Sequence, residues 1–348
     1  MLVVIGICGA VCGCSSQNAA VGPARALFRE AINVLSTRPL GCDRVDWLRV
    51  AAELEITVAP DAPLAAAYPL IQNAVSRLGD PHSRFLPPSQ PVPAATPQPA
   101  GTTASRSDSS NTTRGEIPHV PSARMLDKEI AYVVVPLCTA ADRTSLLEYA
   151  ATLRREIAQA ALAKPRGWLV ELRFNGGGNC WPMLLGLWPL LGDGVQVTGV
   201  AADGEITRIG CDANASWLDR DNQPRYEQLR LDPSPTDVLV RSAPMAVLIG
   251  PWTMSAGEMV AIAFRGKART RLFGEHTGGY TTTTTEFPLS DGSMLVVSVE
   301  TMGDRGGQRA PQRIPPDVPV KIGDWPFVQD QVAQTAITWL LAESGEQP

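Results

Sequence analysis

The sequence contains few of the residues that most catalytic and ligand-binding chemistries need. It has only three histidines among 348 residues, and no group of Cys, His, Asp and Glu has the spacing of metal ligands. Charged residues make up 19% of the chain, the formal net charge is −5, and no basic cluster occurs. These absences argue against a metal centre and against a nucleic-acid-binding surface. We therefore expect no metal, no other cofactor and no nucleic-acid partner.

The N-terminal segment lacks lysine and arginine, although an export signal normally begins with one of them. Residues 1–14 nevertheless resemble the apolar core of such a signal and are too short to span a bilayer. Residues 11–16 (VCGCSS) resemble a bacterial lipoprotein cleavage site, in which Cys14 would carry the lipid. We therefore predict an exported protein of the cell envelope, periplasmic or attached to a membrane through Cys14. A buried apolar segment is the alternative.

The hydrophobic pattern divides the rest of the chain into three parts. Residues 15–86 predict a small helical subdomain, because apolar residues recur there at helical spacing. Residues 87–123 are dominated by Pro, Ser, Thr, Ala and Gln, which is typical of a flexible or extended linker, and His119 within them is expected to be solvated. Residues 124–348 predict an α/β domain. Its alternating strands and helices indicate parallel pairing, and a hairpin over residues 281–299 makes the sheet mixed.

The same pattern predicts the individual elements. The expected helices are 23–35, 43–54, 62–78, 145–163, 256–264 and 325–343. The expected strands are 129–136, 167–172, 195–200, 245–249, 271–274, 281–287 and 293–299.

Ser255 lies between an expected buried strand, 245–249, and the helix 256–264. A tight turn there would expose the hydroxyl, and the first N–H groups of the helix would point at an oxyanion forming beside it. This position favours a nucleophile. A serine at the start of a helix is also typical of an ordinary N-cap, and this segment alone does not separate the two interpretations.

Three consecutive glycines, Gly176 to Gly178, follow the expected strand 167–172. They indicate positive φ angles or a close backbone approach, as an oxyanion hole requires. A phosphate-binding loop is excluded, because Asn179 and Cys180 stand where that motif needs Lys and Ser or Thr. A plain wide turn is the alternative.

His82 lies in a polar turn after an expected helix end. An imidazole in such a turn is a candidate general base, because its ordinary pKa is near neutral pH. Beyond the signal segment the chain also has four cysteines, and an exported protein permits a disulfide. We favour a Cys180–Cys211 pair, because both residues lie in loop-like sequence.

Six motifs in this chain resemble those of one serine peptidase family. That family includes the C-terminal processing peptidases, the tricorn protease core and the interphotoreceptor retinoid-binding proteins. The matching segments are 79–83 (GDPHS), 168–179 (WLVELRFNGGGN), 253–258 (TMSAGE), 273–279 (FGEHTGG), 289–293 (LSDGS) and 315–318 (PPDV). The resemblance implies a Clp-protease/crotonase-like α/β core with a mixed sheet. The family's regulatory PDZ domain has no room in residues 87–123.

The resemblance also implies the chemistry of the site. Ser255 matches the family's nucleophile, and the N–H groups of Gly177 or Gly178 and of Ala256 would form the oxyanion hole. In one branch a lysine activates the serine, but here Tyr280 occupies that position. The nearest lysine, Lys267, is expected on the surface.

The other, tricorn-like branch uses a histidine, and the chain offers two candidates for it. His82 matches by position, and His276 is the competitor because it follows Ser255 by only twenty-one residues.

The tricorn-like branch orients its histidine with a glutamate, which this chain lacks before its Pro-Asp motif. Gln312, Asp80 or Glu286 could take over that role. Glu258, beside the nucleophile, has two interpretations: a part of the nucleophile machinery, or a charge that supports the start of the helix.

These features together predict a serine-type endopeptidase that hydrolyses polypeptides through Ser255 and a histidine base. The missing acid and the missing lysine support an alternative, a weakly active or inactive binding protein on the same scaffold. The substrate, the cleavage preference and the oligomeric state stay open.

Overall fold

The structure is a computed structural model. It describes residues 22–88, 119–126, 129–221, 223–232, 240, 242–323 and 330–345. The predicted signal segment with Cys14 and most of the predicted linker lie outside the described residues. The expected absence of a PDZ domain in that linker therefore stays a prediction. Within the described part of the chain, no helix has both the length and the apolar character that a membrane crossing needs.

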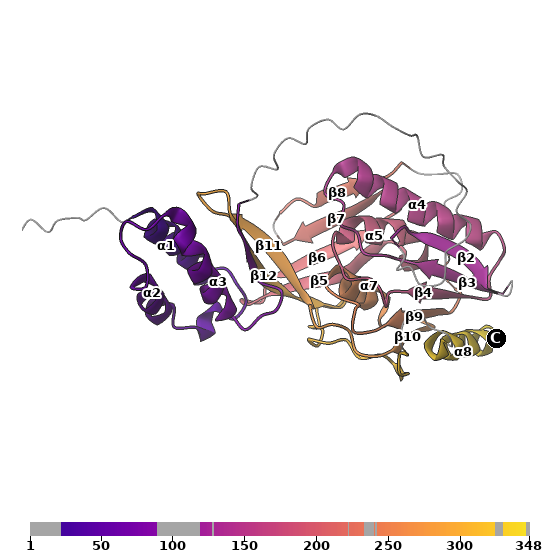
Figure 1. The fold of residues 1–348 in the computed structure, drawn as a ribbon. Coiled ribbons are helices and arrows are strands. Elements are labelled where there is room, and N and C mark those ends of the chain that lie inside the picture. Colours follow the sequence, from indigo (N-terminus) through magenta and orange to yellow (C-terminus); the bar gives the residue numbers. More distant parts are fainter. Residues whose placement is uncertain are drawn as a thin grey trace, which may run out of the picture.

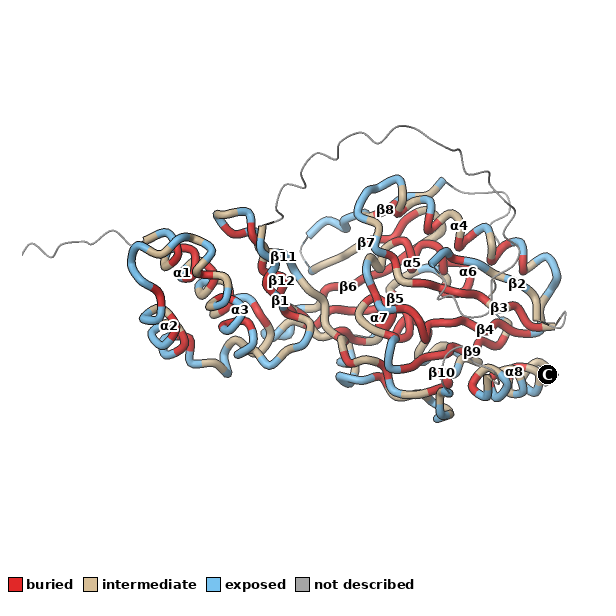
Figure 2. Tube along the Cα trace, in the orientation of Figure 1, coloured by how far each residue is buried: buried red, intermediate tan, exposed pale blue. Residues whose placement is uncertain are grey.

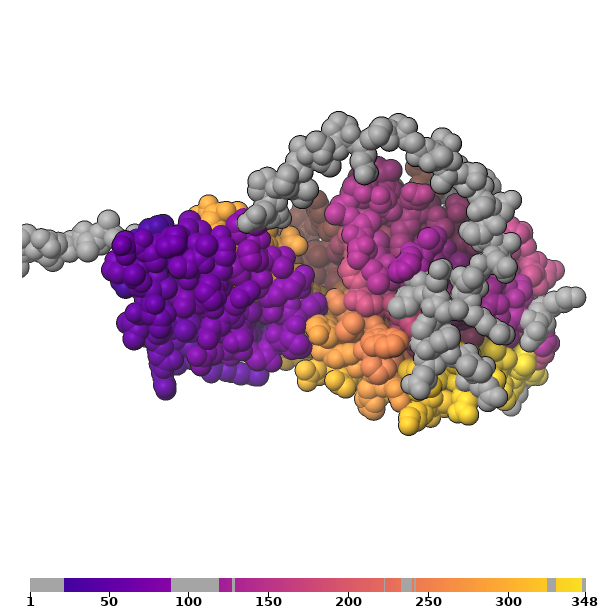
Figure 3. Space-filling model, in the orientation of Figure 1, coloured from indigo at the N-terminus to yellow at the C-terminus, as the bar shows by residue number. Residues whose placement is uncertain are grey.

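The N-terminal helices form a small layer that shares its core with a β-hairpin. These are α1 (Pro23–Leu35), α2 (Trp47–Glu55) and α3 (Tyr68–Ser76), with short 3-10 turns at Cys42–Arg44 and Leu64–Ala67. Pro23 suits the first turn of α1, and the Asp46 side chain caps α2 by accepting a hydrogen bond from Arg49 N. The buried faces of these helices share a core with Leu295 and Val297 of the hairpin. The helices lie beside this hairpin (Figures 1 and 3). The helices of the predicted subdomain therefore share their hydrophobic core with the hairpin.

A first sheet forms the centre of the α/β part. Its strands are β2 (Ser122–Leu126), β3 (Ile130–Val134), β4 (Gly167–Glu171), β9 (Met245–Ile249), β10 (Thr270–Gly274) and β13 (Val318–Pro319). The order is β13-β10-β9-β4-β3-β2, parallel throughout except for β2, which confirms the predicted α/β class. Alternate side chains face opposite sides. Val170 and Val247 lie in the main core, whereas Leu169 and Leu248 pack under the C-terminal helix α8 (Gln331–Gly345).

A second, antiparallel sheet lies across the main core from the first (Figures 1 and 2). Its strands are β1 (Arg84–Leu86), β5 (Gly194–Ala201), β6 (Ile206–Cys211), β7 (Ala215–Arg220), β8 (Tyr226–Arg230), β11 (Thr282–Pro288) and β12 (Met294–Gly303). Between the sheets lie α5 (Cys180–Gly186), α6 (Trp188–Leu191) and α7 (Ala256–Phe264), and α4 (Arg143–Ala161) packs outside α5. The predicted hairpin thus belongs to a separate sheet and not to the parallel one.

The predicted disulfide is wrong. Cys42, Cys138, Cys180 and Cys211 are all free thiols. Cys211 is buried on β6, where its Sγ–H donates to Gly192 O at 3.7 Å, whereas Cys180 opens α5. Loop-like sequence around two cysteines therefore did not indicate that they pair.

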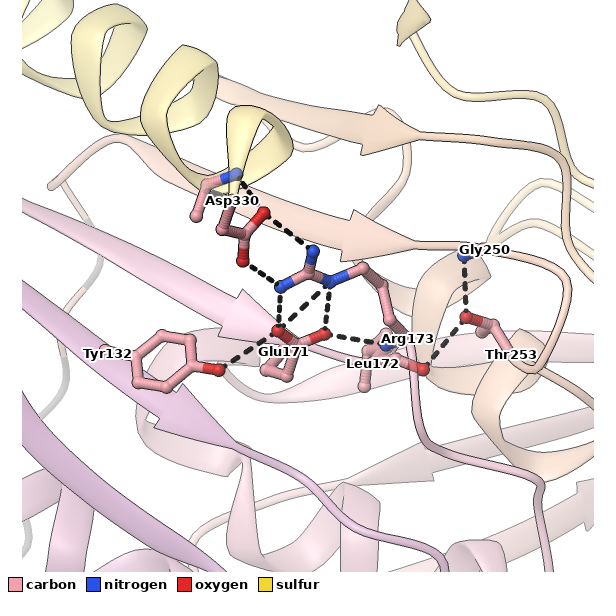
Figure 4. A network of polar contacts seen from close by, with 8 residues as sticks. Tyr132, Glu171, Leu172, Arg173, Gly250, Thr253 and Asp330 are labelled. Atoms are coloured by element: carbon pink, nitrogen blue, oxygen red, sulfur yellow. Dashed lines mark hydrogen bonds and ion pairs between the residues drawn. The ribbon is translucent and has the colours of Figure 1, made fainter. Parts of the chain in front are cut away.

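A buried ion network ties the C-terminal helix to the strand end that leads into the glycine turn (Figure 4). The Arg173 guanidinium, 3% exposed, binds the Glu171 carboxylate at 2.5 Å and the Asp330 carboxylate at 2.7 Å. Close by, Thr253 Oγ1–H donates to Leu172 O at 2.9 Å. The end of β4 therefore anchors α8 on one side and the turn before Ser255 on the other.

We expect Glu171→Gln to lower the free energy of unfolding by about 3 kcal/mol, because it leaves the buried Arg173 cation with one carboxylate fewer. The matched control is Glu129→Gln, which breaks an exposed 2.8 Å ion pair with Arg166 and should cost less than about 1 kcal/mol. Urea unfolding followed by circular dichroism measures both. Similar small losses for the two variants would contradict a structural role for the buried network.

Candidate active site

Ser255 lies at a strained turn directly before α7. Its φ is +53°, and among the described residues only Lys164 and Arg269 share a positive φ without being glycine. Such a conformation costs on the order of 1–3 kcal/mol and persists only where surrounding contacts enforce it. The turn leaves the hydroxyl beside a cavity instead of on a helix surface.

The Glu258 side chain enforces that turn. It is fully buried and accepts four hydrogen bonds: from Ser255 N at 2.9 Å, Thr277 Oγ1 at 2.5 Å, Gly279 N at 2.9 Å and Tyr280 N at 2.7 Å. Burial raises the pKa of this carboxyl above its ordinary value, and the hydrogen bonds oppose the rise. Glu258 therefore supports the start of the helix and also ties it to the 277–280 turn.

The glycine turn meets Ser255 at van der Waals distance. Gly177 has a φ of +103°, and a Cβ there would lie 2.8 Å from Ser255 Cβ. Gly178 has a φ of +96°, and a Cβ there would lie 2.0 Å from Cys138 O. Only glycine fits at these two positions, because the backbone of Gly177 packs against the Ser255 turn and the backbone of Gly178 packs against Cys138.

The two glycines differ in what their N–H groups do. Gly177 is buried and its N–H donates to Asn175 Oδ1 at 3.0 Å, so it is not free to bind an oxyanion. Gly178 is exposed and lines the cavity with Ala256. No acceptor within the described part of the chain takes a hydrogen bond from the N–H of Gly178 or of Ala256. Of the predicted oxyanion donors, Gly178 and Ala256 are thus available and Gly177 is not.

The structure brings His82 to Ser255 from a position 173 residues earlier in the chain. The His82 Nε2 atom lies 3.1 Å from Ser255 Oγ. Its Nδ1 atom lies 2.8 Å from Thr282 Oγ1, which in turn lies 2.9 Å from Ser298 Oγ. The Tyr280 ring stands at the position of the family's lysine and packs edge-on against the imidazole, with 5.4 Å between the ring centroids. A chain of hydroxyl groups therefore occupies the place of the missing acid.

None of the predicted orienting groups contacts the imidazole. The Asp80 carboxylate instead accepts hydrogen bonds from the backbone N–H groups of His82 and Ser83, so it shapes the turn and not the ring. Gln312 is exposed, and its backbone oxygen accepts a hydrogen bond from Thr281. Glu286 is exposed at the cavity.

The competing candidates lie elsewhere. His276 is exposed and lines a separate hollow with Arg313 and Lys321, away from Ser255. Lys267 Nζ–H donates to Leu191 O at 2.6 Å, at the far end of α7. His119 is exposed, as expected of a solvated histidine.

Thr282 is the site residue that the sequence did not indicate. It belongs to a run of five threonines, 281–285, in which nothing marks one member as the partner of a histidine. Only the register of β11 against β12 and the path of the His82 turn single it out.

Two hollows meet at Ser255. One, of about 410 Å³, reaches from Ser255 and Ala256 over the face of the second sheet and includes Trp181. The other, of about 740 Å³, lies on the side of Arg84 and Tyr280. Each has room for part of a peptide.

The site combines a hydroxyl in contact with an imidazole and, beside them, two N–H groups without an acceptor among the described residues. This arrangement is typical of hydrolases that use a serine nucleophile. The model of peptidase family S41 matches residues 129–320, more than half of the 348 residues, and the chain belongs to that family. It is therefore a peptidase of a serine-type family. The matched region contains Ser255, whereas His82 precedes it.

Individual relatives agree with this assignment. A nisin-resistance protein from Lactococcus lactis subsp. lactis is 34% identical over 149 residues, which span 40% of this chain and only 41% of that protein. The structure of a lipoprotein from Streptococcus agalactiae aligns with a TM-score of 0.66 at 21% identity, over 92% of this chain and 97% of that one. The photosystem II D1 C-terminal processing protease aligns with a TM-score of 0.57 at 17% identity, over 86% and 94%. The two structures share the fold, and the predicted resemblance to C-terminal processing peptidases is confirmed.

Burial sets the protonation of His82. It lowers the pKa of the imidazole below the ordinary value of 6.5; the Asp80 carboxylate opposes the shift and the Arg84 guanidinium adds to it. We expect the midpoint of the His82 titration, followed by NMR of the ring protons, to lie below 6.5. His82→Gln identifies the signal by its loss. A midpoint at or above 6.5 would contradict the burial of the ring.

Proposed function

We propose that this chain is a serine endopeptidase in which Ser255 is the nucleophile and His82 the general base. The observation that carries the proposal is the 3.1 Å contact between Ser255 Oγ and His82 Nε2. A base within hydrogen-bond distance of a hydroxyl is the first requirement for activating it. The same contact weakens the alternative of an inactive binding protein, for which these two atoms have no reason to meet.

The proposed reaction has two halves. Ser255 Oγ attacks the peptide carbonyl carbon while its proton passes to His82 Nε2. The carbonyl oxygen becomes an oxyanion that accepts hydrogen bonds from the N–H groups of Gly178 and Ala256. When the C–N bond breaks, the leaving amine takes the proton from His82. Water then attacks the acyl-enzyme while His82 Nε2 accepts its proton. When the bond between the acyl carbon and Ser255 Oγ breaks, His82 returns that proton to Ser255 Oγ, which releases the peptide acid and restores the enzyme.

The hydroxyl chain is compatible with the tautomer that this reaction needs, because a hydroxyl group can accept the Nδ1 hydrogen. Nε2 must be unprotonated to accept the serine proton, so Nδ1 must carry the hydrogen and donate it to Thr282 Oγ1. The Thr282 hydroxyl also shares a hydrogen bond with Ser298 Oγ. A neutral hydroxyl orients the ring but stabilises the imidazolium less than a carboxylate would, which favours a slower enzyme.

Polypeptides are the proposed substrates. β11 hydrogen-bonds along one edge to β12 and pairs with no other strand within the described residues. An extended peptide could add to the other edge of β11, where Thr284 and Glu286 line the cavity at Ser255. Nisin belongs in a substrate panel, because one relative is named for resistance to it.

We further propose that the protein is exported and held in the cell envelope through a lipid on Cys14. The motif at residues 11–16 supports this, together with the similarity to a structure that is titled a lipoprotein.

We expect Ser255→Ala to lower kcat/KM on a cleaved peptide by more than about 10³-fold and to abolish labelling by a fluorophosphonate, since the nucleophile is removed. His82→Gln should lower both rates by about 10²–10⁴-fold. His276→Gln is the matched control and should change neither. Equal labelling of the wild type and Ser255→Ala would remove Ser255 from the mechanism.

We expect Thr282→Val to lower kcat by about tenfold, because Nδ1–H loses its acceptor, and Thr282→Ser to restore it. The lost hydrogen bond favoured the protonated ring, so the pKa of His82 should fall and the acid limb of the kcat/KM profile should move to lower pH. A loss of rate with an unmoved acid limb would assign Thr282 a packing role only.

A further inference from the structure

The cavity beside Ser255 contains a buried carboxylate that takes no part in the proposed reaction. Glu300, on β12, is 8% exposed. Its Oε1 accepts a hydrogen bond from Thr207 Oγ1 at 2.5 Å, and its Oε2 accepts one from Thr283 Oγ1 at 2.7 Å. A Cβ on Gly199 of the neighbouring strand would lie 2.1 Å from Glu300 Oε2. The Glu300 carboxylate therefore occupies the space that a side chain at position 199 would need.

No cation of the described residues makes a hydrogen bond to this carboxylate. The nearest, Arg220 Nη2, lies 4.0 Å from Oε1, and Arg220 Nε donates to Thr207 Oγ1 instead. A carboxylate accepts about four hydrogen bonds, and two are made here. Burying a carboxylate is costly unless a cation contacts it closely, and Arg220 pairs with Glu300 only at a long distance of 4.0 Å. The unused acceptor positions of Glu300 fit a positively charged group supplied by a ligand.

The surroundings of Glu300 fit a particular kind of cation. Ile209, Met259 and Met302 line the same cavity and give it apolar walls. Glu286 adds a second carboxylate at the cavity, against the single guanidinium of Arg220. An aliphatic stem with a positive charge at its tip matches this lining.

The cavity also lies at the reacting centre. Of the two hollows at Ser255, it is the one bounded by both Gly178 and Ala256, whose N–H groups would hold the carbonyl oxygen. A carbonyl held by these two N–H groups would place the residue that carries it beside this cavity.

We propose that this cavity receives the substrate residue before the scissile bond, and that Glu300 selects lysine or arginine there. The inference rests on the proposed function of Ser255. Glu300 touches the substrate side chain and sets specificity; it exchanges no proton in the reaction.

The test uses internally quenched peptides of one sequence with lysine, norleucine or glutamate at a single position, and product masses identify the bond cleaved. Norleucine keeps an aliphatic stem without the charge. The wild type should cleave after lysine with a kcat/KM about 10–100-fold above that for norleucine. In Glu300→Gln the ratio should fall to within about threefold of one. The control Asp219→Asn removes the same charge from the opposite face of β7 and should keep the wild-type ratio.

A second measurement separates this inference from the proposed function. Binding of the same peptides to Ser255→Ala, followed by fluorescence anisotropy, reports the cavity without any catalysis. Tighter binding of the lysine peptide, lost on adding Glu300→Gln, supports the inference even if no variant cleaves. A wild-type preference for norleucine or glutamate, or a lysine preference that survives Glu300→Gln, would overturn it while leaving Ser255 as the nucleophile.

Discussion

The buried carboxylate of Glu258 is the constraint on which the site depends. A backbone turn with φ of +53° at Ser255 is unfavourable on its own, and a carboxylate out of contact with water is costly. The four donors that converge on Glu258 offset both costs, because one of them is Ser255 N and the other three come from the 277–280 turn. Ser255, the proposed nucleophile, is therefore oriented by a cluster of hydrogen bonds to Glu258.

The same dependence extends to the N-terminal helices. His82 reaches Ser255 only because the chain after α3 joins the second sheet as β1, paired with β12. Ser298 on β12 fixes that entry twice: its N–H donates to Ser83 Oγ at 3.0 Å, and its hydroxyl contacts Thr282. The packing of the helices on the hairpin is thus part of the construction of the site.

Local patterns predicted much of the fold, and long-range register decided the rest. Apolar periodicity and the positions of Gly and Pro, which end or begin elements, predict the bounds of α1, α7 and the strand β9. The strands β6 to β8 were missed because each is short and carries few apolar residues. The prolines in α5 and α6 lie near the start of each helix, where they are tolerated, although in sequence they resemble breaks.

The site was predictable to the same depth. The motifs point to Ser255 and His82, which lie in contact in the structure, and their catalytic roles stay a prediction. The choice between Gly177 and Gly178 depends on which N–H the Asn175 side chain takes. The partner of His82 depends on the register of a uniform threonine run.

A hydroxyl group as the partner of His82 has a physical advantage over a carboxylate. Glu286 and Glu300 line the same cavity as the imidazole, and a further carboxylate beside it would add to a negative field in a partly desolvated site. Thr282 orients the ring without that charge, and the ring stays neutral to lower pH at the cost of a less stabilised imidazolium.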